Sequence, residues 1–149
     1  MARQLYETKE DLGRETSAKE RLERRWDVVL NKLPIKYGAD WMAFRDGHPV
    51  AVVEYKNRPH DHDRFDTYML SLHKYMAMLS VAEASFVPAV LLVEFVDGLY
   101  WAKLGECSVE TRWGGRTDRG DSEDSEPCQF IPMSCFTEMG VGCPTSTPH

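Results

Sequence analysis

The sequence lacks any apolar run long enough to cross a membrane. The longest such stretch, AVLLV at residues 89–93, is far shorter than the roughly 20 residues that a transmembrane helix needs. The first ten residues, MARQLYETKE, are charged and do not resemble an apolar targeting segment. These absences predict a cytoplasmic protein with no membrane partner.

Paired cysteines and excess positive charge are missing as well. All four cysteines fall in the last third of the chain, and none forms a C-x-x-C pair, so neither a zinc knuckle nor a redox dithiol is indicated. We expect reduced structural thiols. The net charge of −6 argues against a protein that coats nucleic acid non-specifically, because such binding needs Lys and Arg to neutralise phosphates. Local basic patches remain compatible with nucleic-acid binding.

What remains is the composition of an ordinary folded domain. Of 149 residues, 42% are hydrophobic and 28% are charged, and no repeat is present. A chain of this length buries about two-thirds of its unfolded surface, which is enough for one core without disulfides or metals as staples. We therefore predict a single domain over residues 1–149.

Apolar spacing predicts two helices. One runs from about residue 8 to residue 30, and the other from Tyr68 to about Ala84 with Asp66 or Thr67 as its N-cap. The apolar stripe of the first helix is formed by Leu12, Ala18, Leu22, Trp26 and Val29.

Four strands are expected around the second helix. Residues 41–45 and 49–56 form a hairpin that is apolar on both faces, which is typical of central strands covered on both sides. Residues 88–96 form a buried strand, and residues 99–104 return from it. The Gly-rich, acidic segment 112–127 is expected to be a mobile loop, with CQFIP as a final edge strand.

The apolar strand 49–56 carries a buried acid. If the hairpin turn has three residues, 46–48, then Asp40 lies directly opposite Glu54. A turn of two or four residues would send the two carboxylates to opposite faces. Carboxylates this close repel each other unless a cation lies between them, and two carboxylates with carbonyls and waters suit Mg²⁺.

Lys56 lies on the same face of the strand as Glu54, while Tyr55 packs behind it, because side chains alternate along a strand. For an arbitrary E-x-K the better interpretation is a solvated surface hairpin. Here the apolar context favours a cleft or a ligand, since unpaired charges are costly inside a sheet.

The first helix supplies a third acid. At 100° per residue, Glu15 falls about 20° from Leu22, in the centre of the apolar stripe. An acid there needs a partner or a metal. A metal site and a salt bridge to Arg14, Lys19 or Lys32 are equally compatible with this position.

A helix with Glu15, then Asp40, thirteen intervening residues and Glu54-Tyr55-Lys56, resembles the PD-(D/E)XK nuclease superfamily. The similarity covers about residues 12–104 and is greatest to small phage-encoded resolvase-like nucleases, which carry segments like KLPIKYGAD, EYKNR and DGLYW of this chain. Ala39 stands where the superfamily name expects proline, and no ligand is lost by this difference.

The resemblance implies a restriction-endonuclease-like α/β fold. The expected order is α-β-β-β-α-β-β, with a mixed central sheet flanked by helices. Residues 105–149 would then be a C-terminal extension of the single domain, containing the Gly-rich acidic loop.

The resemblance also implies phosphodiester hydrolysis in DNA with Mg²⁺, which Mn²⁺ could replace. Asp40, Glu54 and the Tyr55 carbonyl would hold the ion, and Glu15 would orient a water or hold a second ion. Lys56 would position hydroxide and stabilise charge at phosphorus. The candidate phosphate-binding residues are Arg58, Lys74, Lys36 and Arg116, with Arg112 as a further possibility.

By the same resemblance, the protein would act as a homodimer on branched, Holliday-junction-like DNA in phage DNA metabolism. The alternative is a non-catalytic module of this fold that recognises nucleic acid or inhibits a host protein. The sequence does not choose between DNA and RNA. The run HDHD at residues 60–63 alternates metal-ligand types, but a solvated turn is the better interpretation of it.

Overall fold

The computed structural model of the chain describes residues 9–115 and 125–140. Its first half contains α1 (Lys9–Trp26), β1 (Val29–Lys32), η1 (Ile35–Tyr37), β2 (Trp41–Arg45), β3 (His48–Asn57), β4 (Thr67–Ser71) and α2 (Leu72–Ser85). Its second half contains β5 (Ala89–Phe95), β6 (Gly98–Lys103), β7 (Glu110–Gly115), β8 (Ser125–Pro132), η3 (Met133–Cys135) and β9 (Thr137–Glu138).

A six-stranded mixed sheet forms the centre of the molecule. Its order is β1-β2-β3-β5-β6-β9, in which β3 and β5 are parallel and the other neighbours are antiparallel. The helix α2 lies on the connection between the two parallel strands, as such a crossover requires. The predicted mixed sheet with flanking helices is confirmed.

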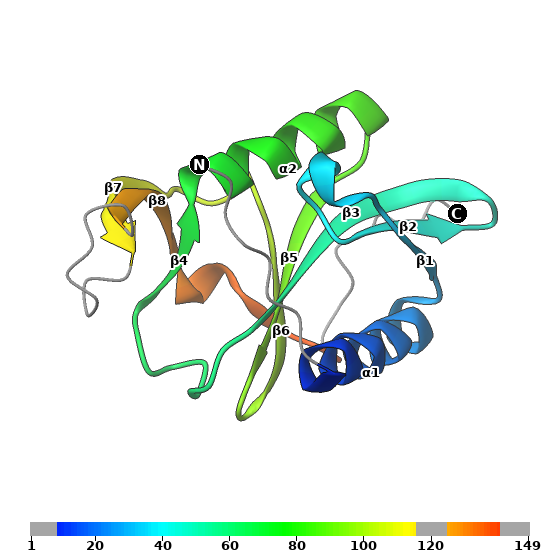
Figure 1. Cartoon of the computed structure of the whole chain (residues 1–149), viewed down its shortest axis with the longest axis horizontal. Coiled ribbons are helices and arrows are strands. Elements are labelled where there is room, and N and C mark those ends of the chain that lie inside the picture. Colours follow the sequence, from blue (N-terminus) through cyan, green and yellow to red (C-terminus); the bar gives the residue numbers. More distant parts are fainter. Residues whose placement is uncertain (1–8, 116–124, 141–149) are drawn as a thin grey trace.

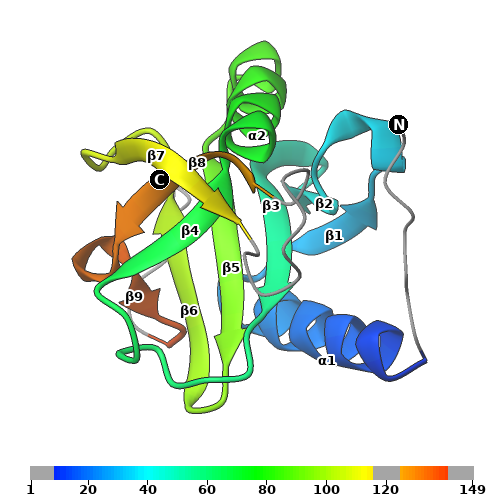
Figure 2. The same cartoon turned by 60° about the vertical axis from the view of Figure 1, so that its left-hand side comes forward.

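The two faces of this sheet are covered differently, as Figures 1 and 2 show. On one face, Leu22 and Trp26 of α1 pack on Val53 and Leu92. The other face packs against α2 and a second sheet of order β4-β8-β7. The central strands β3 and β5 are therefore buried on both sides, as the apolar runs in the sequence predict.

The first helix ends four residues earlier than expected. Asp27 has φ 52°, and the Val28 N–H donates to the Glu23 carbonyl, which is the bond pattern of a Schellman cap. The chain then enters β1, where Leu30 is buried and Val29 is 59% exposed. The prediction of a helix to residue 30 with Val29 in its buried stripe was wrong.

The second helix begins later than expected, because residues 67–71 form strand β4. Burial alternates along this strand, with Tyr68 and Leu70 inside, and it pairs with β8. Ser71 is the N-cap of α2, and its Oγ accepts from the Lys74 N–H. The prediction of a helix from Tyr68 with Asp66 or Thr67 as N-cap was wrong.

The C-terminal part also differs from expectation. CQFIP lies in β8, which is the middle strand of the second sheet and not an edge strand. Part of the expected loop 112–127 forms β7 and β8, while residues 116–124 lie outside the described residues. Cys107 and Cys135 form a disulfide, contrary to the expectation of reduced thiols, and Cys128 is buried and free. In the described ranges, no helix is long and apolar enough to span a membrane.

Candidate active site

The hairpin of β2 and β3 places Asp40 and Glu54 side by side. Its turn has two residues, since Arg45 pairs with His48, so the three-residue turn used for the register was wrong. A bulge between Ala43 and Phe44 then shifts the register by one. Trp41 therefore pairs with Val53, and at the next position along the hairpin Asp40 comes opposite Glu54. This is the same pair that a three-residue turn without a bulge would have produced.

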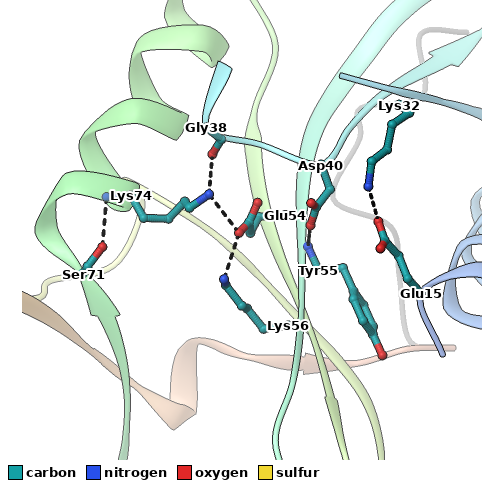
Figure 3. Close-up of polar contacts among 9 residues, drawn as sticks. All are labelled: Glu15, Lys32, Gly38, Asp40, Glu54, Tyr55, Lys56, Ser71 and Lys74. Carbon is teal, nitrogen blue, oxygen red and sulfur yellow. Dashed lines mark hydrogen bonds and ion pairs between the residues drawn. The ribbon is translucent and has the colours of Figure 1, made fainter. Parts of the chain in front are cut away.

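Glu54 is a buried carboxylate neutralised by two lysines. It is 2% exposed, and its Oε2 lies 3.2 Å from Lys56 Nζ and 3.1 Å from Lys74 Nζ. Its other oxygen, Oε1, is buried and has no hydrogen-bond partner. In Figure 3 the two ammonium groups approach one oxygen of Glu54 and leave the other open. A buried oxygen in this state is one that a ligand can satisfy.

Lys74 reaches Glu54 because of local structure at both ends of the contact. The Ser71 cap fixes the start of α2 and puts Lys74 in its first turn. Lys74 Nζ also donates to the Gly38 carbonyl at 3.1 Å. Gly38 has φ 74°, and a Cβ there would meet the Ala77 Cβ at 2.8 Å, so glycine allows η1 to approach α2 this closely.

Asp40 is held against the backbone of β3. Its Oδ2 accepts from the Tyr55 N–H at 2.7 Å. Burial, and next the charge of Glu54, raise the pKa of Asp40 from 3.8 to about 6, while the Tyr55 N–H and Lys32 oppose the shift. Two carboxylates that repel in this way would both be stabilised by a cation between them.

The residues present fit a divalent metal ion. Asp40 and Glu54 are hard oxygen donors that lie opposite each other, and Glu54 offers a buried oxygen without a partner. Burial, and next the charge of Glu54, raise the pKa of Asp40, and binding of a cation would relieve the repulsion between the two carboxylates. The third expected protein ligand, the Tyr55 carbonyl, lies on the same strand between Glu54 and Lys56.

Glu15 lies apart from this cluster. It projects from α1, which covers the opposite face of the sheet, and its Oε1 is 2.7 Å from Lys32 Nζ. Lys32 on β1 also lowers the pKa of Asp40 by its charge, so this lysine stands between the helix acid and the strand acid. The salt bridge to Lys32 is one of the two arrangements that the sequence leaves open for Glu15.

The expected phosphate-binding residues are dispersed. The Arg58 guanidinium stacks over the Tyr68 ring at 5.0 Å, just beyond β3. Lys36 is exposed on η1, over the Tyr37 ring. Arg112 lies over the Phe130 ring on the second sheet, and Arg116 lies outside the described residues. Among those of these cations that the structure describes, only Lys74 contacts the acidic pair.

A second group of metal-ligand types lies at the far end of β5. Ligand atoms of His62, Asp63 and Asp97 lie within 4.8 Å of one another. His62 Nδ1 is 2.5 Å from Asp97 Oδ2, and this hydrogen bond raises the pKa of His62. The group is largely exposed and is separate from Glu54 and Asp40.

Comparison with known proteins decides the family. The family described as "Phage putative PDDEXK endonuclease" matches residues 1–139. The chain belongs to this family. The match extends well past residue 104, where the resemblance in the motifs ends.

A solved structure shows the same fold. Hjc, a Holliday junction resolvase from Archaeoglobus fulgidus, aligns with a TM-score of 0.57 at 13% identity, over 83% of this chain and 95% of Hjc. No curated protein matches the sequence. The family match and the fold of this resolvase therefore agree. PDDEXK nucleases use divalent metal ions.

Sequence reasoning missed one cation of this PDDEXK site. The sequence indicates Lys32 only as a partner of Glu15, whereas in the structure its charge also lowers the pKa of Asp40. Its position depends on β1, a strand that the sequence does not predict and whose first two residues fall in the predicted helix. The local signal that could have indicated it is its place as the first residue of the KLPIKYGAD segment.

Replacing a lysine that neutralises Glu54 should destabilise the fold more than replacing an ordinary surface lysine. In EDTA we expect Lys74→Met to lower the free energy of unfolding by about 2 kcal/mol, because a buried carboxylate loses one of its two cations. Added Mg²⁺ should recover part of this loss. Urea unfolding with and without Mg²⁺ measures both effects.

Lys103→Met is the matched control. Its side chain is 28% exposed, against 27% for Lys74, but its partner Glu106 is 63% exposed. The loss there should stay below about 1 kcal/mol. Equal losses for the two variants would show that Glu54 does not depend on Lys74.

The pKa of Asp40 predicts a pH dependence of stability without metal. The folded state holds this proton more tightly than the unfolded state, so stability is lost as the pH rises from about 4 through about 6. Asp40→Asn removes this loss and can still accept the Tyr55 N–H. Between pH 4 and pH 6 the free energy of unfolding of the variant should rise relative to that of the wild type. Above this range the difference should stay constant.

Urea unfolding in EDTA from pH 4 to pH 8 tests this expectation. Asp46→Asn, in the exposed turn of the same hairpin, controls for removal of one carboxylate. An Asp40→Asn advantage that does not change between pH 4 and pH 7 would contradict the assigned cause.

Proposed function

We propose that this endonuclease hydrolyses phosphodiester bonds of DNA with Mg²⁺, which Mn²⁺ can replace, held by Asp40, Glu54 and the Tyr55 carbonyl. The observation that carries the proposal is the partnerless, buried Oε1 of Glu54 next to a second carboxylate with a raised pKa. The family supports phosphodiester chemistry.

The residues of the cluster have distinct proposed roles. A bound divalent ion lowers the pKa of water and polarises a phosphate oxygen. The Lys56 side chain is 33% exposed beside Glu54, and we propose that its ammonium stabilises the charge that develops on phosphorus. Glu15 is the remaining acid of the set. Its partner Lys32 acts on Asp40 by its charge, and we propose that Glu15 orients the attacking water from this side of Asp40.

Cations around the cluster would bind the DNA backbone. We propose this role for Arg58, Lys74, Lys36 and Arg116. Lys74 lies against Glu54, so its ammonium would be next to a phosphate held at the acidic pair. Phosphate contacts of this kind position the substrate and carry no sequence information.

We further propose that the substrate is branched DNA of the four-way-junction type and that a homodimer supplies one active site per strand. Similarity in fold to a Holliday junction resolvase supports the substrate class. Cutting two strands symmetrically requires two sites, which an isologous dimer provides. The cytoplasm of the bacterial host is the proposed location, as the phage family suggests.

The test compares a four-way junction, a linear duplex of the same length and a plasmid, each with Mg²⁺, Mn²⁺ or EDTA. We expect metal-dependent cutting that favours the junction. Light scattering during size exclusion, with and without the junction, measures the oligomeric state. Absence of cleavage of all three DNAs in both metals would contradict the function, and equal rates on junction and duplex would contradict the substrate class.

A further inference from the structure

An aromatic cavity lies next to the E-x-K strand. It has a volume of about 300 Å³ and is lined by the loop after β3, by β4 and by side chains from β5, β8 and η3. The residues that matter here are Arg58, Phe65, Tyr68, Phe95 and Phe130. The ring of His60 joins the walls, 5.1 Å from Phe65 and 5.6 Å from Phe95 between centroids.

The cavity and the acidic cluster share one face of the sheet. Arg58 follows Lys56 by two residues, and its N–H donates to the Glu94 carbonyl, so it continues the β3 ladder. Two residues of strand place it about 7 Å beyond Lys56 on the same side. Tyr68 lies under Arg58. Burial raises the pKa of its phenol, the charge of Arg58 opposes this rise, and the charge of Glu54 adds to it, which places Tyr68 within reach of the acidic cluster.

The chemistry of the walls selects one class of occupant. Flat rings and two methionines, Met69 and Met133, line most of the cavity, so a phosphate or sugar chain would lose its hydration there. A nucleobase presents an apolar π face of matching shape, and stacking of a base on aromatic side chains does not depend on sequence. Arg58 at the edge then meets the phosphate of the same nucleotide.

We propose that this cavity receives an unpaired nucleobase of the DNA strand that is cut, a proposal that rests on the proposed nuclease function. A base enters it only after leaving the duplex stack, which costs least where the base is already unpaired. The cavity would therefore select branched, bulged or frayed DNA over continuous duplex. This selection comes from a site beside the catalytic cluster and needs no sequence readout.

Phe65 is the wall residue best suited to a test. It is 53% exposed on the loop after β3, and the Arg64 guanidinium lies over its ring, so truncation should not disturb the core. Phe86→Ala is the matched control, since Phe86 is 94% exposed at the C-terminal end of α2 and does not line the cavity. Neither residue belongs to the acidic cluster.

Binding is measured in EDTA on two DNAs of equal length and charge, a perfect duplex and a duplex with one unpaired nucleotide. The wild type should bind the second about tenfold more tightly. Phe65→Ala should lose this preference and keep its affinity for the perfect duplex, while Phe86→Ala should keep both. An abasic unpaired nucleotide should reproduce the loss in the wild type and add nothing to Phe65→Ala.

Three results would overturn the proposal: no binding to either DNA, no preference in the wild type, or a Phe65→Ala loss that is equal on both DNAs. Cleavage is scored separately with Mg²⁺. Base-dependent binding without cleavage would contradict the proposed hydrolysis and support the assignment of the cavity. Cleavage without base-dependent binding does the reverse.

Discussion

Asp40→Asn should abolish metal-dependent DNA cleavage, with a loss of at least about 10³-fold, because one of the two carboxylates that would hold the ion loses its charge. Asparagine keeps the shape and an oxygen that accepts the Tyr55 N–H. The fold should therefore persist. Rates on the four-way junction at increasing Mg²⁺, together with circular dichroism of the variant, measure the two effects.

The metal titration separates a binding defect from other causes. In Asp40→Asn the midpoint for Mg²⁺ should move to much higher concentration, whereas Asp46→Asn in the exposed turn should match the wild type in rate and midpoint. A folded Asp40→Asn protein that cuts at the wild-type rate in low Mg²⁺ would exclude Asp40 from the site.

The register of the hairpin shows how a prediction can reach the right geometry by the wrong route. The Asp46-Gly47 sequence favours a two-residue turn, and that is the turn which forms. Without a further irregularity, it would have paired Asp40 with Val53. The bulge beside Ala43 corrects the count, and nothing local in the sequence marks it, since bulges depend on how the sheet is covered and twisted.

The ends of α1 illustrate a different limit. Amphipathic spacing located the helix and its buried residues Ala18, Leu22 and Trp26. It could not locate the end, because the cap residue is Asp27 and not the glycine that usually signals a left-handed cap. The strand β1 that follows could not be recognised from the sequence, because Val29 also fits the helical stripe. In the structure Val29 is exposed and Leu30 is buried.

The second sheet was the least predictable part of the fold. Tyr68 and Leu70 alternate correctly for a strand, but five residues before a helix carry too little signal to separate the two. Their partner β8 lies about sixty residues later, and such a pairing is decided by packing on α2 and not by local propensity. The aromatic cavity could not be predicted either, because it forms between these segments, which are distant in the sequence.

The acidic pair was predictable because burial and charge conflict there. A strand with apolar residues on both faces cannot carry Glu54 without compensation, so the conflict itself indicated a site. The compensation now seen is two ammonium groups on one oxygen, with Lys74 supplied by α2. A site arranged in this way costs stability when empty, as the raised pKa of Asp40 also indicates.

Lys56→Met should leave a folded protein that still binds Mg²⁺ but cuts about 10²–10³-fold more slowly at saturating metal, because it loses the cation facing the phosphate. Lys74 remains on Glu54 Oε2, so the buried carboxylate keeps one partner. The midpoint for Mg²⁺ should stay near that of the wild type, which distinguishes this variant from Asp40→Asn. Lys103→Met, whose lysine has a similar exposed fraction, should retain the full rate. A Lys56→Met protein that loses Mg²⁺ affinity but recovers the wild-type rate at high Mg²⁺ would reassign Lys56 from the chemistry to support of Glu54.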